Sequence, residues 1–493
     1  MNVSSAFLIL LLFTSWLFPS ANRTPFRNVS HHPPRYIFVF IGDGMGQNHI
    51  LATEKYTSQP APYKDWLISW VSTYPQEGYY EPSSAWKDFH WVQQNLITDS
   101  AAAATALFSG KKTTNARINV SPDGSMHYKT ITEEAHEAGL SVGAVTSVPI
   151  SHATPGAWMA HNTSRQNGYA IANEGIWSEP NTTGAVSLPY YGGGYGSTFP
   201  PIDVLIGGGH PTWYLGNPYI DDRIVQKLRS DSNEAGKHRF IERIEGSPNG
   251  GARLRALAEN AATRLLVGIF GGSGGNLEYR LAEGSGANPE NPSLAEMTIA
   301  AIEILNRNPN GFILLVEGGA IDFAAHQNHL DKLIGEVIEF NNAVQAAVDW
   351  VNAPDSPATW SNTLFIVTAD HETGHLTNAP NVFPNHPLGE VSPRTLQLEK
   401  SCLSTCLRAS WDDANGNLEI DPDEAVHWAW NSTYHTNSLV PLYVYGRMPV
   451  AISLMVKGTD PIRGEYIDNT DIYRLLKAAL PFQEFIYLPL IVR

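Results

Sequence analysis

The 493-residue sequence has only two cysteines, Cys402 and Cys406. Two thiols at this spacing have too few partners for a convincing zinc site. If the chain is exported, they can form a disulfide that closes a small loop, because disulfides persist in oxidising compartments. The spacing alone does not distinguish this disulfide from two free thiols.

Basic residues are also scarce, with 32 Lys and Arg against 48 Asp and Glu and a net charge of −16. Proteins that bind a nucleic-acid backbone carry a basic patch, so this balance argues against nucleic acid as a partner. It does not exclude small anionic substrates, because bound metal ions can reverse the local field.

No stretch beyond the N-terminus is apolar for long enough to cross a membrane. The apolar run at residues 5–18 is itself short for a span, and small residues suited to cleavage follow it at 19–21. We therefore expect a cleaved signal peptide at residues 1–21 and a secreted or periplasmic protein without a stable membrane anchor. A retained anchor is the alternative, since no Lys or Arg precedes the run.

Apolar runs that end in glycine-rich turns recur along the chain. They lie at residues 35–46, 141–147, 202–209, 311–319 and 363–372. Continuous apolar runs are typical of strands buried on both faces of a mostly parallel sheet. Helical patterns lie at 293–305, 330–351 and 470–480, where Thr470 or Asp471 can cap the last helix. The sequence thus predicts an α/β fold with a central sheet between helices.

Two stretches rich in Gly, Pro and Asn, at 181–201 and 376–430, are expected to be surface excursions. The second contains both cysteines and an acidic segment at 413–424. Counted as a twelve-residue calcium loop, this segment offers oxygen ligands from Asp413, Asn415, Asn417, Asp421 and Glu424. Its sixth position is Leu418, where such loops need glycine for a sharp turn. A bound Ca²⁺ and a plain acidic turn both stay open.

Acidic and histidine side chains gather where the expected strands end. They are Asp43, Glu317, Asp322, His326, Asp370, His371 and His435. One such residue is weak evidence, since an Asp after a strand is usually a turn former and a lone His is more often structural. Asp322 and His326 are four residues apart and therefore share one helical face. Mixed oxygen and nitrogen ligands without cysteine suit zinc in a site open to substrate, whereas Glu and Thr oxygens suit magnesium.

Six motifs occur in the order found in one enzyme family. They are FIGDGMG, TDSAAAATAL, TSVPISHATPGAWMAH, VEGGAIDFAAH, TADHETGH and YHTNSLVPLYVYG. On these motifs the chain resembles the alkaline phosphatases from Tyr36 to about Leu480. The resemblance implies a single catalytic domain at residues 35–485, with the 376–430 insertion inside it. It also implies small phosphate monoesters as substrates, and a homodimer is common among relatives.

The resemblance further implies two zinc ions and one magnesium ion. The first zinc site consists of Asp322, His326 and His435. The second consists of Asp43, Asp370 and His371, with Ser100 approaching the same ion as a further metal contact. The magnesium site uses Asp43, Thr154 and Glu317, with His152 nearby.

Ser100 is the nucleophile that the resemblance implies, and Arg165 is the residue that grips phosphate. Asp99 is then expected to orient Arg165. A helix N-terminus favours negative charge at Ser100, and the alanines that follow it leave room for ions and phosphate.

Two positions depart from a well-studied bacterial member of the family. His152 stands where that member has an acidic residue; histidine there also occurs in the family, and it would either weaken magnesium binding or favour a third zinc. Phe323 replaces a lysine that assists phosphate binding, so an aromatic wall is expected there instead.

Three other functions compete with monoester hydrolysis. A phosphodiesterase or promiscuous phosphoesterase on the same scaffold more often has Thr as nucleophile and lacks the magnesium set and the arginine. A sulfatase needs a C-x-P-x-R motif, which the chain lacks. A non-catalytic, metal-stabilised binding protein would have no use for Ser100 and Arg165.

Overall fold

The computed structural model of the protein describes residues 33–178 and 201–481. The signal peptide expected at residues 1–21 lies outside these residues, and so does nearly all of the excursion expected at 181–201. Among the described helices, none is both long and apolar enough to cross a membrane.

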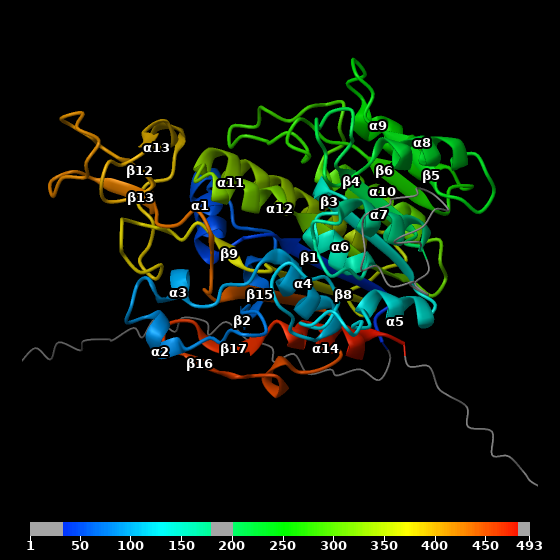
Figure 1. Cartoon of the computed structure of the whole chain (residues 1–493), viewed down its shortest axis with the longest axis horizontal. Helices are drawn as coiled ribbons and strands as arrows, with labels where there is room; N and C mark the ends of the chain where they lie inside the picture. The colour runs from blue at the N-terminus through cyan, green and yellow to red at the C-terminus, as the bar shows by residue number, and fades with distance from the viewer. Residues whose placement is uncertain (1–32, 179–200, 482–493) are drawn as a thin grey trace, which may run out of the picture.

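One large sheet runs through the molecule (Figure 1). Its described strands have the order β16-β17-β2-β15-β8-β1-β7-β3-β4-β6-β5. They are β1 (Tyr36–Gly42), β2 (Leu67–Ser72), β3 (Ser141–Pro149), β4 (Val204–Gly208), β5 (Arg239–Glu242), β6 (Leu266–Ile269), β7 (Phe312–Gly318), β8 (Thr363–Thr368), β15 (Val440–Gly446), β16 (Gly458–Asp460) and β17 (Gly464–Asp468). All neighbours from β8 to β5 are parallel, whereas β15 is antiparallel to both β8 and β2.

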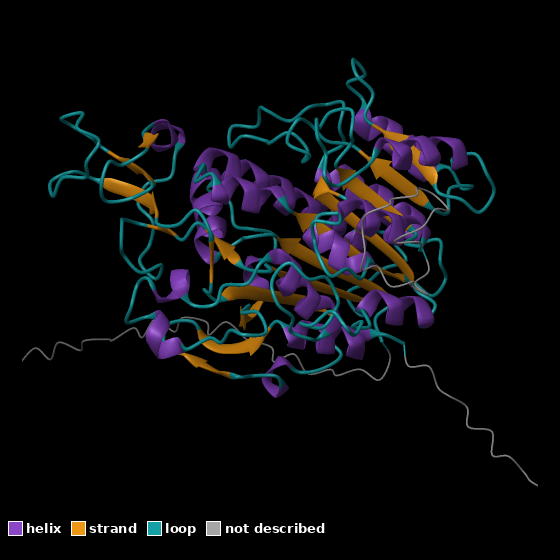
Figure 2. Cartoon of the chain, viewed as in Figure 1, coloured by secondary structure: helices purple, strands orange, loops and turns teal. Residues whose placement is uncertain are grey.

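Helices cover both faces of this sheet (Figure 2). The described helices are α1 (Gln47–Thr57), α2 (Pro82–Ala85), α3 (Trp91–Gln94), α4 (Ser100–Ser109), α5 (Ile131–Glu137), α6 (Ala153–Met159), α7 (Gly168–Trp177), α8 (Asp222–Asp231), α9 (Gly250–Glu259), α10 (Leu294–Leu305), α11 (Ala320–His326), α12 (Leu330–Asn352), α13 (Pro393–Gln397) and α14 (Thr470–Ala479), with short 3-10 turns at Lys64–Trp66 and Ile452–Leu454. Helix α12 contacts α1, α10 and α11, whereas α4 contacts α6 and α14. The predicted α/β class is confirmed.

The predicted strands coincide with β1, β3, β4, β7 and β8, and every residue of β1, β7 and β8 is buried. Helices cover both faces of each of these strands, so no side chain on either face meets water. This burial explains why the strand sequences are continuously apolar. Helices α10 and α12 also match their predicted ranges. The capping role predicted for Thr470 or Asp471 is wrong: α14 begins at Thr470 after Asn469, and Asp468 Oδ1 accepts the Thr470 N–H at 3.1 Å.

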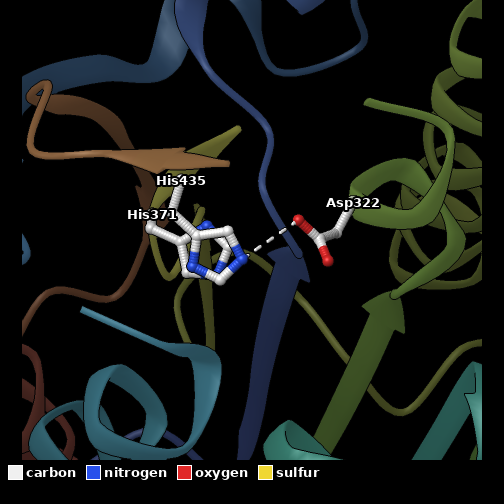
Figure 3. A group of neighbouring side chains, drawn as sticks. All are labelled: Asp322, His371 and His435. Carbon is white, nitrogen blue, oxygen red and sulfur yellow. Dashed lines mark ion pairs between the residues drawn. The ribbon is translucent and has the colours of Figure 1, made fainter. Parts of the chain in front are cut away.

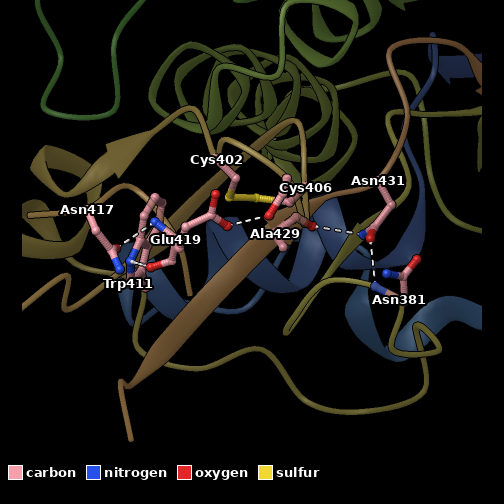
Figure 4. Close-up of a disulfide and its surroundings, with 9 residues drawn as sticks. Asn381, Cys402, Cys406, Trp411, Asn417, Glu419, Ala429 and Asn431 are labelled. Carbon is pink, nitrogen blue, oxygen red and sulfur yellow. Dashed lines mark hydrogen bonds between the residues drawn. A yellow bond between two sulfur atoms is a disulfide. The ribbon is translucent and has the colours of Figure 1, made fainter. Parts of the chain in front are cut away.

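The segment between Leu376 and Trp430 forms a sheet of its own. Its described strands are β10 (Leu376–Thr377), β11 (Glu399–Lys400), β12 (Arg408–Trp411) and β13 (Val426–Trp430), in the order β10-β13-β12-β11. Cys402 and Cys406 form a disulfide beside this sheet (Figure 4). The partly buried cysteines pack against a small cluster of Ala409, Trp411 and Ala429.

Candidate active site and metal centre

The predicted ligands come together because three parallel strands end at the same level. Ile41 of β1 is paired with Glu317 of β7 and with Thr368 of β8. Asp43 and Asp370 follow two residues after Ile41 and Thr368, so their carboxylates leave the sheet at the edge where Glu317 lies. This is the carboxyl edge of the parallel strands, where α/β folds place their sites.

Gly44 allows the loop after β1 to approach the other ligands closely. Its φ is 70°, a left-handed conformation that favours glycine. A Cβ atom at this position would lie 2.7 Å from Thr373 Oγ1 and 2.8 Å from Asp322 Oδ1. The Gly44 N–H also donates to Asp370 Oδ1 at 3.1 Å.

The first group of ligand atoms surrounds Asp322 on α11 (Figure 3). His326 Nε2 lies 3.3 Å from Asp322 Oδ2, and His435 Nε2 lies 3.6 Å from Asp322 Oδ1. The two histidine nitrogens are 3.1 Å apart. The three residues implied for the first zinc site are therefore adjacent. His371 also reaches this group, with its ring stacked on that of His435 at a centroid distance of 3.6 Å.

The second group is centred on His371 Nε2. This atom lies 3.4 Å from Asp43 Oδ1, 3.2 Å from Asp370 Oδ2 and 3.2 Å from Ser100 Oγ. All four side chains are buried. The ligands implied for the second zinc site thus converge with the implied nucleophile.

A third group combines Asp43 with His152 and Glu317. Thr146 donates its hydroxyl to Glu317 Oε2. Thr154 lies on α6, two residues after His152, and is fully buried, and its Oγ1 has no hydrogen-bond partner among the described residues. Asp43 is therefore shared between the second and third groups, as the resemblance implies for a bridging ligand.

The electrostatics of this cluster fit bound cations. Burial raises the pKa of Asp43 well above its ordinary range, and the neighbouring Asp370 raises it further. Burial likewise raises the pKa of Glu317 to about 8 and that of Asp370 to about 7. Both Asp43 oxygens and Asp370 Oδ2 are buried without a hydrogen-bond partner among the described residues. Unpaired buried carboxylates are costly, and divalent cations remove that cost.

Three histidines of the cluster, His371, His152 and His435, are suited to metal binding because burial favours their neutral form. Burial lowers the pKa of His371 well below its ordinary value and lowers that of His152 to about 3. A neutral imidazole keeps the lone pair that binds a metal ion. At His326 burial is outweighed by the Asp322 carboxylate, which raises the pKa to about 9, so this imidazole would release a proton on binding a metal ion. The residues present therefore fit three sites with oxygen and nitrogen ligands, of which the second and third each combine two carboxylates with one histidine.

Ser100 is the first residue of α4, and Asp99 is its N-cap. Asp99 Oδ1 accepts the Ala102 N–H at 2.9 Å, while Oδ2 accepts Arg165 Nη1 at 3.0 Å and the Ala116 N–H at 2.9 Å. One carboxylate therefore caps the helix that carries Ser100 and also holds Arg165.

An aromatic wall stands beside Arg165. Arg165 Nη2 donates to His152 Nε2 at 3.1 Å, so this imidazole nitrogen is the acceptor. The His152 ring lies between Phe323 and Tyr219, at centroid distances of 5.4 and 5.7 Å. The two departures noted in the sequence, His152 and Phe323, are thus in contact with each other.

Sequence reasoning missed two threonines that hold the ligands. Thr373 donates to Asp322 Oδ1 at 2.6 Å, and Thr146 donates to Glu317. Both lie inside motifs that were recognised, but threonine is common in strands and its role depends on which carboxylate the fold brings near. Only the strand register could have indicated them, because Thr146 of β3 is paired with Glu317 of β7 and Thr373 lies five residues beyond the end of β8.

The acidic loop at 413–424 lies apart from this cluster, in the 376–430 insertion. Lys400 Nζ lies 2.9 Å from Asp413 Oδ2, and Asp421 Oδ2 accepts the side-chain amides of Asn415 and Asn417. Leu418 has a φ of 61°, so the sharp turn is present although glycine is absent. The predicted calcium ligands are near one another, but the carboxylates of Asp413 and Asp421 already accept hydrogen bonds from Lys400 and from the two asparagines.

Comparison with known proteins identifies this arrangement. A model of the alkaline phosphatase family matches residues 34–481. The chain belongs to the alkaline phosphatase family. Alkaline phosphatase 4 of Bacillus subtilis is 30% identical over 90% of this chain and 89% of its own length. The chain is therefore a phosphomonoesterase of a metal-dependent family, as its motifs predicted.

Solved structures of alkaline phosphatases share the fold. The enzyme of Thermus thermophilus has a TM-score of 0.61 at 20% identity, covering 91% of this chain and 92% of its own. The cold-active enzyme of a psychrophilic Shewanella has a TM-score of 0.60 at 22% identity, covering 91% of this chain and 100% of its own.

Proposed function

We propose that this alkaline phosphatase hydrolyses phosphate monoesters through a phosphoserine intermediate on Ser100, with two zinc ions and one magnesium ion. The observation that carries the proposal is the position of Ser100 Oγ, 3.2 Å from His371 Nε2 at the N-terminus of α4. A buried serine among metal ligands and at a helix N-terminus is placed to react with an anion.

The ions would be held by the three groups of side chains described above. Asp322, His326 and His435 would hold the first zinc, and Asp43, Asp370 and His371 the second. Asp43, Thr154 and Glu317 would hold magnesium, beside His152. When bound, zinc lowers the pKa of a serine hydroxyl and stabilises negative charge on the transferring phosphoryl group.

Ser100 carries the phosphoryl group between two displacements. Its Oγ attacks phosphorus, the bond from phosphorus to the ester oxygen breaks, and the alcohol leaves with the proton that Ser100 loses. Water then attacks the phosphoserine, inorganic phosphate departs, and Ser100 regains a proton. The N-terminus of α4 favours the negative charge present in both steps.

Arg165 orients the phosphoryl group in both steps. Its guanidinium is kept near Ser100 because Asp99, the residue before the nucleophile, accepts from Nη1 at 3.0 Å. A planar guanidinium can donate two parallel hydrogen bonds to phosphate oxygens, which lysine cannot. Phe323 and Tyr219 flank His152 beside it and limit the space available to the leaving group.

The experiment is a substrate panel on the purified protein. p-Nitrophenyl phosphate and bis(p-nitrophenyl) phosphate are compared after chelator treatment and after return of zinc, magnesium or calcium. We expect monoester hydrolysis at alkaline pH that is lost with chelator and restored by zinc, with about two zinc per chain. Faster cleavage of the diester than of the monoester would favour the phosphodiesterase alternative.

Export is part of the proposal. The apolar run at residues 5–18 and the small residues at 19–21 support cleavage near residue 21. N-terminal sequencing of protein recovered outside the cytoplasm should begin just after this position. An intact Met1 in that material would favour a retained anchor instead.

A further inference from the structure

Two short strands bring the ligand histidines side by side. β9 (Glu372–Thr373) is antiparallel to β14 (His435–Thr436), and Glu372 is paired with Thr436. His371 directly precedes Glu372, and His435 directly precedes Thr436. The spacing of the two imidazoles therefore depends on the interactions that hold β9 and β14 together.

The Glu372 carboxylate holds the two strands together through its hydrogen bonds. Oε2 accepts the hydroxyl of Thr436 at 2.5 Å, and Oε1 accepts the His375 N–H at 2.9 Å. The first bond holds the strand of His435, and the second closes the turn that follows His371. The Glu372 side chain is only 9% exposed, so water cannot replace these bonds easily.

The same side chain also contacts the loop that carries Asp43. A Cβ atom on Gly46 would lie 2.3 Å from Glu372 Cγ, so this loop packs directly on the glutamate. The Gly46 N–H donates to His49 Nδ1 at 3.1 Å, and His49 Nε2 lies 3.7 Å from Glu372 Oε1. Glu372 thus touches or bonds three segments that each supply a candidate zinc ligand.

We propose that Glu372 is a positioning residue that sets the spacing of Asp43, His371 and His435 and thereby the zinc affinity of the centre. Glu372 contacts no reacting atom and acts through the segments it holds together. Partners of metal ligands typically contribute 10–100-fold to metal affinity. The inference rests on the proposed function, because it assumes that these residues bind zinc.

The test is zinc binding in competition with a chromophoric chelator, measured for the full chain. Glu372→Met keeps the volume and removes both acceptors, so zinc affinity should fall at least about tenfold. Glu372→Gln should stay within about threefold of wild type, because the amide oxygen accepts from His375 while the amide nitrogen donates to Thr436. Thr436→Val removes the hydrogen bond to Glu372 Oε2, together with the contacts of Oγ1 with Ser438, but leaves the His375 N–H bonded to Oε1, so it should show a smaller loss than Glu372→Met.

Glu336→Met is the matched control. Glu336 is a buried carboxylate on α12 that accepts the Arg280 N–H at 3.0 Å, outside the candidate centre. Its removal should lower the stability of the metal-free chain to urea but leave zinc affinity unchanged.

Unchanged zinc affinity in both Glu372→Met and Thr436→Val would overturn the proposal. An equal loss of zinc affinity in Glu336→Met would also overturn it, because the effect would then be general destabilisation. If the wild-type chain binds no zinc, the proposed function is what fails. Thr436→Val keeps the test decisive if Glu372→Met does not fold.

Discussion

Arg165 Nη1 lies 3.0 Å from Asp99 Oδ2, so the residue before the proposed nucleophile holds the proposed phosphate ligand. The ion pair is partly exposed, with side-chain exposures of 18% and 20%. Asp99→Asn keeps a good N-cap for α4 but removes the charge that restrains Arg165. We expect the inhibition constant of inorganic phosphate to rise roughly 2–5-fold, as for a partly exposed ion pair.

Asp99→Ala separates the two roles of this residue. It also removes the cap, so it should lower the free energy of unfolding by about 1 kcal/mol more than Asp99→Asn. Equal phosphate inhibition in wild type and Asp99→Asn would show that Asp99 serves only as the helix cap.

Replacement of the nucleophile tests the covalent step. Ser100→Ala removes one hydroxyl from a fully assembled cluster, so turnover of p-nitrophenyl phosphate should fall by at least about a thousandfold. The zinc content should stay near two per chain, because the carboxylate and imidazole ligands of both groups are intact. Steady-state kinetics measures the loss of turnover, and metal analysis measures the zinc content. Phosphoserine at residue 100, trapped by acid quenching of the wild type, should be absent from this variant, and full activity without Ser100 would refute the assignment.

His152 is expected to control which metal occupies the third site. His152→Asp adds a carboxylate to a group that already contains Asp43 and Glu317, and hard oxygen ligands favour magnesium. The magnesium concentration that gives half-maximal activation should fall at least about tenfold, the scale of a ligand change. Phe323→Leu is the control, since it removes the ring 5.4 Å from His152 but no ligand atom. An unchanged magnesium midpoint in His152→Asp would exclude this role.

The sequence predicted those parts of the fold where burial is complete. Strands β1, β7 and β8 have no exposed residue, so their apolar runs are continuous and their ends locate Asp43, Glu317 and Asp370. The strands that were missed are short or partly exposed. Strand β5 has four residues, of which only one is buried, and β2 begins with an exposed leucine.

The supporting residues of the site could not be predicted for a different reason. Thr146, Thr373 and Glu372 are ordinary residues of strand ends, and their importance comes from partners that are distant in the sequence. Glu372 contacts Thr436, 64 residues away, and Thr146 donates to Glu317, 171 residues away. One sequence contains no signal for such pairs until the register of the strands is known.

The calcium hypothesis for residues 413–424 can be tested through Lys400. Its ammonium lies 2.9 Å from Asp413 Oδ2, where a calcium ion would need that oxygen. If the loop binds calcium, Lys400→Met should tighten binding, because a competing cation is removed. Asp413→Asn combined with Glu424→Gln should remove one equivalent of calcium. Isothermal titration checks both variants, and an unchanged calcium count in the double variant would end the hypothesis.

The pH dependence of stability should depend on His161, which lies four residues before Arg165. His161 Nδ1 lies 3.1 Å from Glu174 Oε1, and Nε2 lies 3.5 Å from Glu133 Oε2. Burial favours the neutral imidazole, but the two carboxylates outweigh burial and raise the pKa of His161 to about 10. The folded chain therefore holds a proton that the unfolded chain releases at about pH 6.5.

The sign follows from this difference in pKa. The contribution of His161 to stability is fully present below about pH 6.5 and is lost as the pH rises through about 10, by up to about 1.4 kcal/mol per pH unit. His161→Gln cannot bind that proton, so its deficit in unfolding free energy should shrink between these pH values. Urea unfolding of both proteins at each pH measures the deficit.

His238→Gln is the control for this titration. His238 Nε2 contacts the Ile202 carbonyl at 2.7 Å, and burial lowers the pKa of His238, so the imidazole is neutral above about pH 6.5. The loss of unfolding free energy in His238→Gln relative to wild type should therefore be the same at each pH. A constant deficit for His161→Gln as well would mean that His161 is also neutral. Deprotonation at alkaline pH still leaves one N–H on the ring, which can donate from Nδ1 to Glu174 Oε1. The backbone N–H of His161 donates to Glu174 Oε2 at 3.0 Å, so the segment before Arg165 should stay fastened to α7 while the charge is lost.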